Sequence, residues 1–304
     1  MISETTRGVF TIAATPFLPD GTLDLNSIDR MVAFYTDKGA SGLTILGMMG
    51  EAGKLSASES LSVIRRVTAA TDLPVVAGVT APGLAAMKAL SVDAVEAGAA
   101  GVMVAPSGAL KTDAQTTDYF MNVGETLDGI PWVLQDFPLS TNVVVPVSVI
   151  LKVVEECANC VMLKHEDWPG LEKISALRAA SDAGSRRISI LTGNGGLFLP
   201  EEMARGADGA MTGFAYPEMM AMVIAAMEKG DPDRAQDLFD AYLPLIRVEN
   251  QPGLGLPVRK YILAKRGAIA HPTIRKPGPA LSAVAISEVE RLIARLDKRL
   301  AELH

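Results

Sequence analysis

The chain has 304 residues, of which 49% are hydrophobic and 21% charged, a composition typical of an ordinary globular protein. Its net charge is −7 and no basic run stands out, which argues against a nucleic-acid-binding protein. No apolar stretch is long enough to span a membrane, and the N-terminus lacks the basic start and apolar segment of a signal peptide. We therefore expect a cytoplasmic protein without a membrane or nucleic-acid partner.

Eight short apolar runs recur at a steady interval along the chain. They cover residues 8–17, 42–47, 74–79, 101–106, 131–138, 160–166, 188–195 and 209–215. Each run is continuously apolar rather than alternating, as expected of parallel strands that are buried on both faces.

Helical patterns fill the gaps between these runs. Apolar residues recur at helical spacing in 26–40, 56–71, 83–99 and 146–158. Ser56 and Glu59 have the spacing of a capping box, which predicts the start of a helix.

Eight strands, each followed by a helix or a helical turn, predict an α/β fold of the (β/α)8 TIM barrel type. An open doubly wound sheet is the alternative, but no G-x-G-x-x-G turn follows the first run. After about residue 218 the strand pattern stops and helical patterns follow. We predict a barrel over 1–217 and a C-terminal helical extension over 218–304, packed on the barrel or on a partner subunit.

The two cysteines, Cys157 and Cys160, are spaced C-x-x-C. A redox pair or half of a zinc site is one interpretation, but zinc needs two further ligands and no second paired-ligand motif exists. The interpretation that we prefer is two reduced thiols where a helix passes into a strand. We therefore expect no metal site.

Lys164 is the outstanding residue among the predicted carboxyl ends of the strands, where barrel enzymes place their active sites. Side chains alternate along a strand, so Lys164 shares one face with Met162 and Glu166. Desolvation in an apolar lumen disfavours the ammonium form, and a neutral amine can attack a ketone to form a Schiff base. The alternative is a lysine that extends to solvent at the rim of the barrel.

Two glycine-containing turns follow other runs. In "GMMGE" (47–51), glycines flank Met48 and Met49, and such a turn can point backbone N–H groups at a carboxylate. In "TGNGG" (192–196), Gly193 permits a close approach of the backbone to a ligand. Ordinary turn chemistry is the alternative for both.

Six segments in the same order resemble the dihydrodipicolinate synthase / N-acetylneuraminate lyase family of class I pyruvate aldolases, over nearly the whole chain. They are "TIAATPF" (11–17), "GMMGE", "QDFP" (135–138), "LKHED" (163–167), "TGNGG" and "DGAMTGFA" (208–215). The resemblance implies an imine between Lys164 and pyruvate or another 2-oxo acid, with its carboxylate on the amides of Met48 and Met49. It also implies a homo-oligomer, a dimer or more often a homotetramer, and no metal or organic cofactor.

The resemblance carries departures as well. The family's synthases move protons through one threonine and two tyrosines, and here Met48, Gly108 and Gln135 stand in those places. Ser140 stands where the synthases have an arginine for the aldehyde substrate's carboxylate. Lysine biosynthesis is therefore not the expected activity, and sialic acid cleavage, which shares the tyrosine, is not favoured either.

Glu166 is our candidate to replace the tyrosine, since it follows Lys164 by two residues on the same face. Gln135 can donate a hydrogen bond but cannot act as an acid or base. His165 and Asp136 are expected to face the surrounding helices.

The predicted mouth of the barrel is apolar, and its residues are Met48, Met49, Phe137, Met211 and Phe214. This apolar character suggests an alkyl or aromatic aldehyde as the partner of pyruvate.

The sequence thus predicts a Schiff-base-forming lyase or aldolase for pyruvate or a related 2-oxo acid. Lys164 and Glu166 are the predicted catalytic residues. The predicted substrate-binding residues are Met48, Met49, Gln135, Gly193 and Met211. A dehydratase for a deoxy-oxo sugar acid and a barrel that binds a ligand without turnover are the alternatives.

Overall fold

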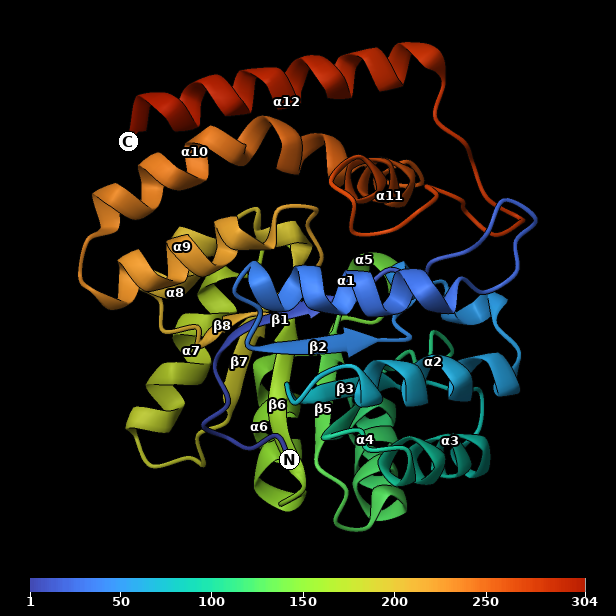
Figure 1. Ribbon diagram of the computed structural model, residues 1–304. Helices are drawn as coiled ribbons and strands as arrows, with labels where there is room; N and C mark the ends of the chain where they lie inside the picture. The colour runs from blue at the N-terminus through green and yellow to red at the C-terminus, as the bar shows by residue number, and fades with distance from the viewer. Residues whose placement is uncertain (304) are drawn as a thin grey trace.

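Eight parallel strands close into a barrel, with helices around it and three further helices beyond (Figure 1). The computed structural model describes residues 1–303. The strands are β1 Gly8–Ile12, β2 Gly42–Ile45, β3 Val75–Gly78, β4 Gly101–Val104, β5 Trp132–Asp136, β6 Cys160–His165, β7 Ser189–Thr192 and β8 Gly209–Ala210. Each strand pairs with the next, and β8 pairs with β1. The predicted TIM barrel with C-terminal helices is confirmed.

The helices follow the strands in chain order. They are α1 Leu25–Asp37, α2 Ala57–Ala69, α3 Leu84–Glu96, α4 Asp113–Leu127, α5 Pro138–Thr141, α6 Val147–Glu156, α7 Leu171–Asp182, α8 Leu199–Ala204, α9 Pro217–Glu228, α10 Pro232–Glu249, α11 Gly255–Lys265 and α12 Ala283–Leu303. Short 3-10 turns lie at Met48–Gly50 (η1), Ala52–Lys54 (η2) and Asn194–Gly196 (η3). The predicted capping box is present at the start of α2, where Ser56 and Glu59 satisfy each other's backbone N–H groups.

The alternation of side chains along each strand separates the core into two clusters. Met162 belongs to the cluster that fills the barrel lumen, whereas the next residue, Leu163, belongs to the cluster between the strands and the helices. Ile2 closes one end of the lumen, and its N–H donates to the carbonyl of Ala100 at 3.0 Å. The same alternation directs Lys164 inward and His165 outward.

The strands are shorter than the predicted runs, chiefly at their carboxyl ends. The first run was predicted over 8–17 but β1 ends at Ile12, and the last was predicted over 209–215 but β8 ends at Ala210. The remaining apolar residues form loops at the mouth of the barrel. An apolar run therefore includes both a strand and the buried loop that follows it.

The C-terminal helices lie together on one side of the barrel, with α12 along α10 (Figure 1). Helix α9 packs against α8 and β1, in the position of the ring helix that follows the eighth strand. We therefore propose that the extension, predicted to start at residue 218, begins with α10. None of the helices described in residues 1–303 is long and apolar enough to cross a membrane.

Candidate active site

A cavity of about 690 Å³ opens at the carboxyl ends of the strands. Its walls come from the loop after β2, the ends of β5 and β6, the turns after β7 and β8, and the end of α10 with the residues that follow it. Lys164, Glu166 and Gln135 lie at its inner surface, and each is less than a tenth exposed.

Lys164, Glu166 and Gln135 form one polar group, joined by an ion pair and a hydrogen bond. The Lys164 Nζ atom lies 2.8 Å from Glu166 Oε2, and Gln135 Nε2 donates to the same oxygen at 2.8 Å. Gln135 is opposite Lys164 in the β5–β6 register, so both side chains point into the lumen side by side. The structure therefore brings together three of the residues predicted for the site.

Gly193 makes room for Glu166. A Cβ atom on Gly193 would lie 2.1 Å from Glu166 Cγ and 2.5 Å from Oε1, so any other residue would displace the carboxylate. The Gly193 N–H donates to the carbonyl of His165 at 2.8 Å, which fixes this approach. Glu166 Oε1 accepts no hydrogen bond from residues 1–303, while Oε2 has two partners. Lys164 and Gln135 thus hold one carboxylate oxygen, while the other lies against Gly193.

The other titratable residues beside Lys164 lie outside the lumen. His165 Nε2 is 2.9 Å from the carbonyl of Gly170, and its Nδ1 is 3.6 Å from Asp136 Oδ2. Lys173 on α7 bridges Asp136 at 2.7 Å and Asp167 at 2.6 Å. These contacts link the outer face of β6 to the surrounding helices. Strand alternation predicts this outward direction for His165 and Asp136.

Glu202 on α8 is a buried carboxyl that the sequence did not single out. It is 4% exposed, and its Oε2 atom has no hydrogen-bond partner among residues 1–303. Burial raises the pKa of Glu202 to about 7, against the opposing effects of the Thr192 hydroxyl and His165. Glu202 also lines a smaller hollow of about 320 Å³, between the residues that follow β6, the start of α7, and α8.

The "GMMGE" segment forms a tight turn at the cavity. Met48 and Met49 begin η1, so their N–H groups precede the first hydrogen bond of the turn. Leu46 and Glu51 on either side adopt left-handed backbone angles, with φ of 56° and 55°. The Met48 side chain is 48% exposed and contacts the hydroxyl of Ser140.

Glu51 anchors this turn to the C-terminal part of the chain. Its side chain is buried, and it pairs with Lys260 through Oε1 and with Lys54 through Oε2 at 2.8 Å. The Lys260 ammonium is fully buried and also donates to the carbonyls of Thr15 and Thr273 at 2.7 and 2.8 Å. Burial lowers the pKa of Lys260 to about 8, although Glu51 opposes the shift.

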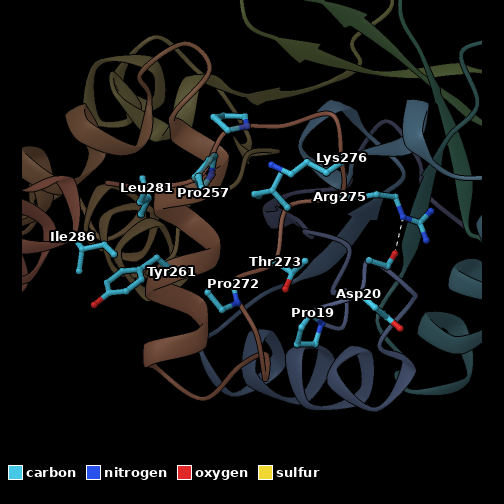
Figure 2. A pocket seen from close by; sticks show the side chains of 14 residues that line it. Pro19, Asp20, Pro257, Tyr261, Pro272, Thr273, Arg275, Lys276, Leu281 and Ile286 are labelled. Atoms are coloured by element: carbon cyan, nitrogen blue, oxygen red, sulfur yellow. Dashed lines mark hydrogen bonds between the residues drawn. The ribbon is translucent and has the colours of Figure 1, made fainter. Parts of the chain in front are cut away.

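Residues 272–276 complete the anchor. The Arg275 N–H donates to Glu51 Oε2 at 3.1 Å, and the Arg275 guanidinium donates to the carbonyl of Gly21 at 2.9 Å. Figure 2 shows Thr273, Arg275 and Lys276 on this segment, which forms one wall of a surface hollow of about 610 Å³. This hollow lies apart from Lys164, and none of the predicted site residues lines it.

The end of α10 and the start of α11 supply a polar wall that sequence reasoning missed. Five polar residues of this region line the cavity: Arg247, Glu249, Asn250, Gln251 and Arg259. Asn250 Nδ2 donates to the carbonyl of Asn194 at 3.0 Å, and Glu249 accepts from the Ala215 N–H at 3.1 Å. Arg259 is buried, pairs with Glu249 and donates to the carbonyl of Gly213. The only local signal was the Pro/Gly-rich segment "NQPGLGLPVRK".

Two residues predicted for the mouth lie elsewhere. Met211 is fully buried in the lumen cluster and does not line the cavity. Phe214 packs beside Tyr216 and Tyr242, behind the cavity wall. Met48, Met49 and Phe137 do line it. Ala210 belongs to the outer cluster and Met211 to the lumen cluster, so Met211 faces inward as alternation predicts but packs in the lumen core instead of lining the cavity, and Phe214 lies in the loop after β8.

The cysteines lie at the junction of α6 and β6 and are both free and buried. Burial raises the pKa of both thiols. Within residues 1–303, no group of three or more histidine, cysteine or acidic side chains is arranged to hold a metal ion.

Comparison with known proteins places this site in a family. A model of the dihydrodipicolinate synthetase family matches residues 5–296. The chain is 29% identical to L-2-keto-3-deoxyarabonate dehydratase of Azospirillum brasilense, over 96% of this chain and 94% of the relative. It is 32% identical to 4-hydroxy-tetrahydrodipicolinate synthase of Methanothrix thermoacetophila, over 79% and 81%. The crystal structure of a dihydrodipicolinate synthase from Rhodopseudomonas palustris is 50% identical, with a TM-score of 0.95 over 97% of this chain and 99% of that one.

Proposed function

The chain belongs to the dihydrodipicolinate synthetase family, and we propose that it is a lyase that forms a Schiff base with pyruvate or a related 2-oxo acid through Lys164. Its relatives are named as synthases and as a dehydratase, so the protein is an enzyme of this lyase group. The observation that carries the proposal is the buried contact of 2.8 Å between Lys164 Nζ and Glu166 Oε2.

This contact supplies both a nucleophile and a proton carrier. Proton transfer from the Lys164 ammonium to Glu166 frees the amine, which attacks the carbonyl carbon of the 2-oxo acid to give a carbinolamine. The carbinolamine oxygen then takes the proton back from Glu166 and leaves as water. The product is a protonated imine on Lys164 and an ionised Glu166, so one water is released and no proton is gained or lost.

The protonated imine withdraws electrons from the neighbouring carbon, and in this proposal Glu166 acts as the base. If it takes the proton of a hydroxyl one carbon further out, the C–C bond breaks, leaving an enamine and an aldehyde. If it takes a proton from the carbon beside the imine, the same hydroxyl can leave as water with that proton. Gln135 holds Glu166 Oε2 throughout, and we assign it a positioning role.

We further propose that the leading N–H groups of η1, at Met48 and Met49, hold the carboxylate of the 2-oxo acid. The anchoring of Glu51 by Lys260 and Arg275 supports this role, since a fixed turn keeps its N–H groups directed at the ligand without reorganisation.

We also propose a cytoplasmic homo-oligomer, either a dimer or a tetramer. Light scattering coupled to size-exclusion chromatography checks its mass.

A deoxy-oxo sugar acid dehydratase is the second candidate. The relative from Azospirillum brasilense, which aligns over nearly the full length, carries that kind of name. Synthase names among the relatives do not select a substrate, because Gln135 and Ser140 depart from the synthase pattern. Product analysis separates the candidates: an aldehyde indicates C–C cleavage, and a dehydrated oxo acid indicates loss of water.

The test is reductive trapping. Incubation with pyruvate and borohydride should add the mass of one reduced pyruvate to the peptide that contains Lys164. Lys164→Met should abolish the adduct, whereas Lys152→Met, which changes an exposed lysine on α6, should retain it. If no 2-oxo acid is trapped on the wild-type protein, the proposal is wrong.

Glu166→Gln tests the proton carrier. The amide retains the size of the carboxylate but cannot accept a proton, so we expect turnover to fall at least ~100-fold. Glu172→Gln is the control, since Glu172 is an exposed carboxylate on α7. Full turnover in Glu166→Gln would assign proton transfer to another group.

A further inference from the structure

A second hollow adjoins the catalytic cavity, between α10 and α12. Its volume is about 580 Å³, and its charged and amide side chains are Arg247, Gln251, Glu288, Arg291 and Arg295. Arg247 and Gln251 line both the hollow and the catalytic cavity. The two spaces therefore meet at Arg247.

The hollow carries an excess of positive charge. Three arginines line it against the single carboxylate of Glu288. Among residues 1–303, no acidic side chain lies within ion-pair distance of any of these three arginines. In contrast, Arg259, Arg266 and Arg275, which also belong to the C-terminal part of the chain, are all paired. The chain as a whole is acidic, with a net charge of −7, so this concentration of unpaired guanidinium groups is local.

The size of the catalytic cavity indicates a substrate longer than pyruvate. A volume of about 690 Å³ is in the range of pockets that enclose whole cofactors or drug-sized ligands. Apolar side chains, among them Met48, Phe137 and Leu256, line the cavity that Lys164 and Arg247 share. A ligand that reaches from Lys164 to Arg247 would have an apolar middle and polar ends.

We propose that the hollow binds the distal anionic group of a 2-oxo acid whose carbonyl carbon lies at Lys164, and that Arg247 determines this specificity. This inference rests on the proposed function. The distal group is a carboxylate or a phosphate, because a guanidinium presents paired N–H donors that match either anion. Arg291 and Arg295 on α12 add charge on the far side of the hollow.

The test compares 2-oxo acids of equal chain length with and without a distal carboxylate. 2-Oxoglutarate and 2-oxopentanoate compete with pyruvate for borohydride trapping, and 2-oxoadipate and 2-oxohexanoate form a second pair. We expect each diacid to compete at about tenfold lower concentration than its monoacid. Arg247→Gln should bring the ratio close to one, with each variant measured relative to its own trapping of pyruvate. Arg299→Gln, where the arginine pairs with Glu302 outside the hollow, is the matched control.

A ratio near one in the wild-type protein, or a ratio that survives Arg247→Gln, would overturn the inference. Calorimetry with glutarate, a dicarboxylate without an oxo group, tests the hollow even if pyruvate is not trapped. The same measurement with inorganic phosphate shows whether the hollow prefers a carboxylate or a phosphate. Binding of either probe that Arg247→Gln abolishes and Arg299→Gln retains supports the site. If the wild-type protein binds neither probe and shows no diacid preference, the site does not exist.

Discussion

At the scale of single residues, strand alternation separates neighbours in the sequence into different roles. Lys164 and Glu166 face the cavity and form an ion pair, whereas His165 between them faces the helices. Gln135 joins the pair because the β5–β6 register places it opposite Lys164. A shift of one residue in either strand would exchange these faces and separate the three side chains of the proposed site.

Glu202 gives the stability of the protein a pH dependence. Its pKa is about 7 in the folded protein and near 4.5 in the unfolded chain, so below pH 4.5 it is protonated in both states. Between pH 4.5 and 7 the unfolded chain releases a proton that the folded protein keeps, and stability falls as pH rises through this window. The penalty at pH 8 is about 3 kcal/mol by the usual conversion of a pKa shift.

Glu202→Gln cannot ionise and should escape this penalty. We expect its free energy of unfolding to match that of the wild type at pH 4.5 and to exceed it by up to ~3 kcal/mol at pH 8. Urea denaturation at both pH values measures this difference. Glu201→Gln, at the exposed neighbouring position, should follow the wild type. An equal difference at the two pH values would show that ionisation of Glu202 is not the cause.

At the scale of elements, the loops at the mouth are held by helices from the other end of the sequence. Lys260 on α11 holds the turn η1 through Glu51, and Asn250 at the end of α10 holds η3 through Asn194. The turns η1 and η3 are therefore positioned by the extension. The extension is part of the proposed site as well as a cover for the barrel.

The Glu51–Lys260 pair tests this anchoring. Glu51→Gln leaves the buried Lys260 ammonium without its counter-charge, so we expect a loss of about 3 kcal/mol in the free energy of unfolding and a higher KM for the 2-oxo acid. In Glu51→Leu with Lys260→Met both charges are removed, and the loss should be smaller than in the single variant. A double-mutant cycle of Glu51→Leu, Lys260→Met and their combination, followed by urea denaturation, measures the coupling. Equal losses in the single and double variants would mean that the buried charge is not the cause.

At the scale of the whole molecule, barrel and extension share one apolar core. Val289 and Leu296 of α12 belong to the same cluster as the outer faces of the strands. The unfolding of α12 should therefore expose the surface of α10, and with it the residues that hold the loops at the mouth. We expect a single cooperative unfolding transition for the chain.

Leu296→Ala measures this coupling. A buried leucine truncated to alanine costs about 2–5 kcal/mol, and the loss should lower the midpoint of one common transition seen by both far-ultraviolet circular dichroism and tryptophan fluorescence. Lys298→Ala, at an exposed position of α12, should leave the midpoint unchanged. A first step in which helix is lost while fluorescence stays native would show that the extension unfolds independently.

The sequence by itself determined the barrel, its eight strands and the inward position of Lys164 and Glu166. Burial on both faces requires continuous apolar runs, and the two-residue period of a strand fixes which side chains share a face. Both are local properties, so they can be read from neighbouring residues. The ends of the strands were less predictable, because buried loops such as 13–17 are as apolar as the strand before them.

Only the tertiary structure decided which distant residues meet. Gln135 and Glu166 are 31 positions apart, and their hydrogen bond depends on strand register. Arg247 and Asn250 reach the cavity because α10 folds back over the mouth, and Met211 stays out of it because its side chain packs within the lumen cluster. Register and helix packing are set by the fit of whole surfaces, which no local pattern of residues encodes.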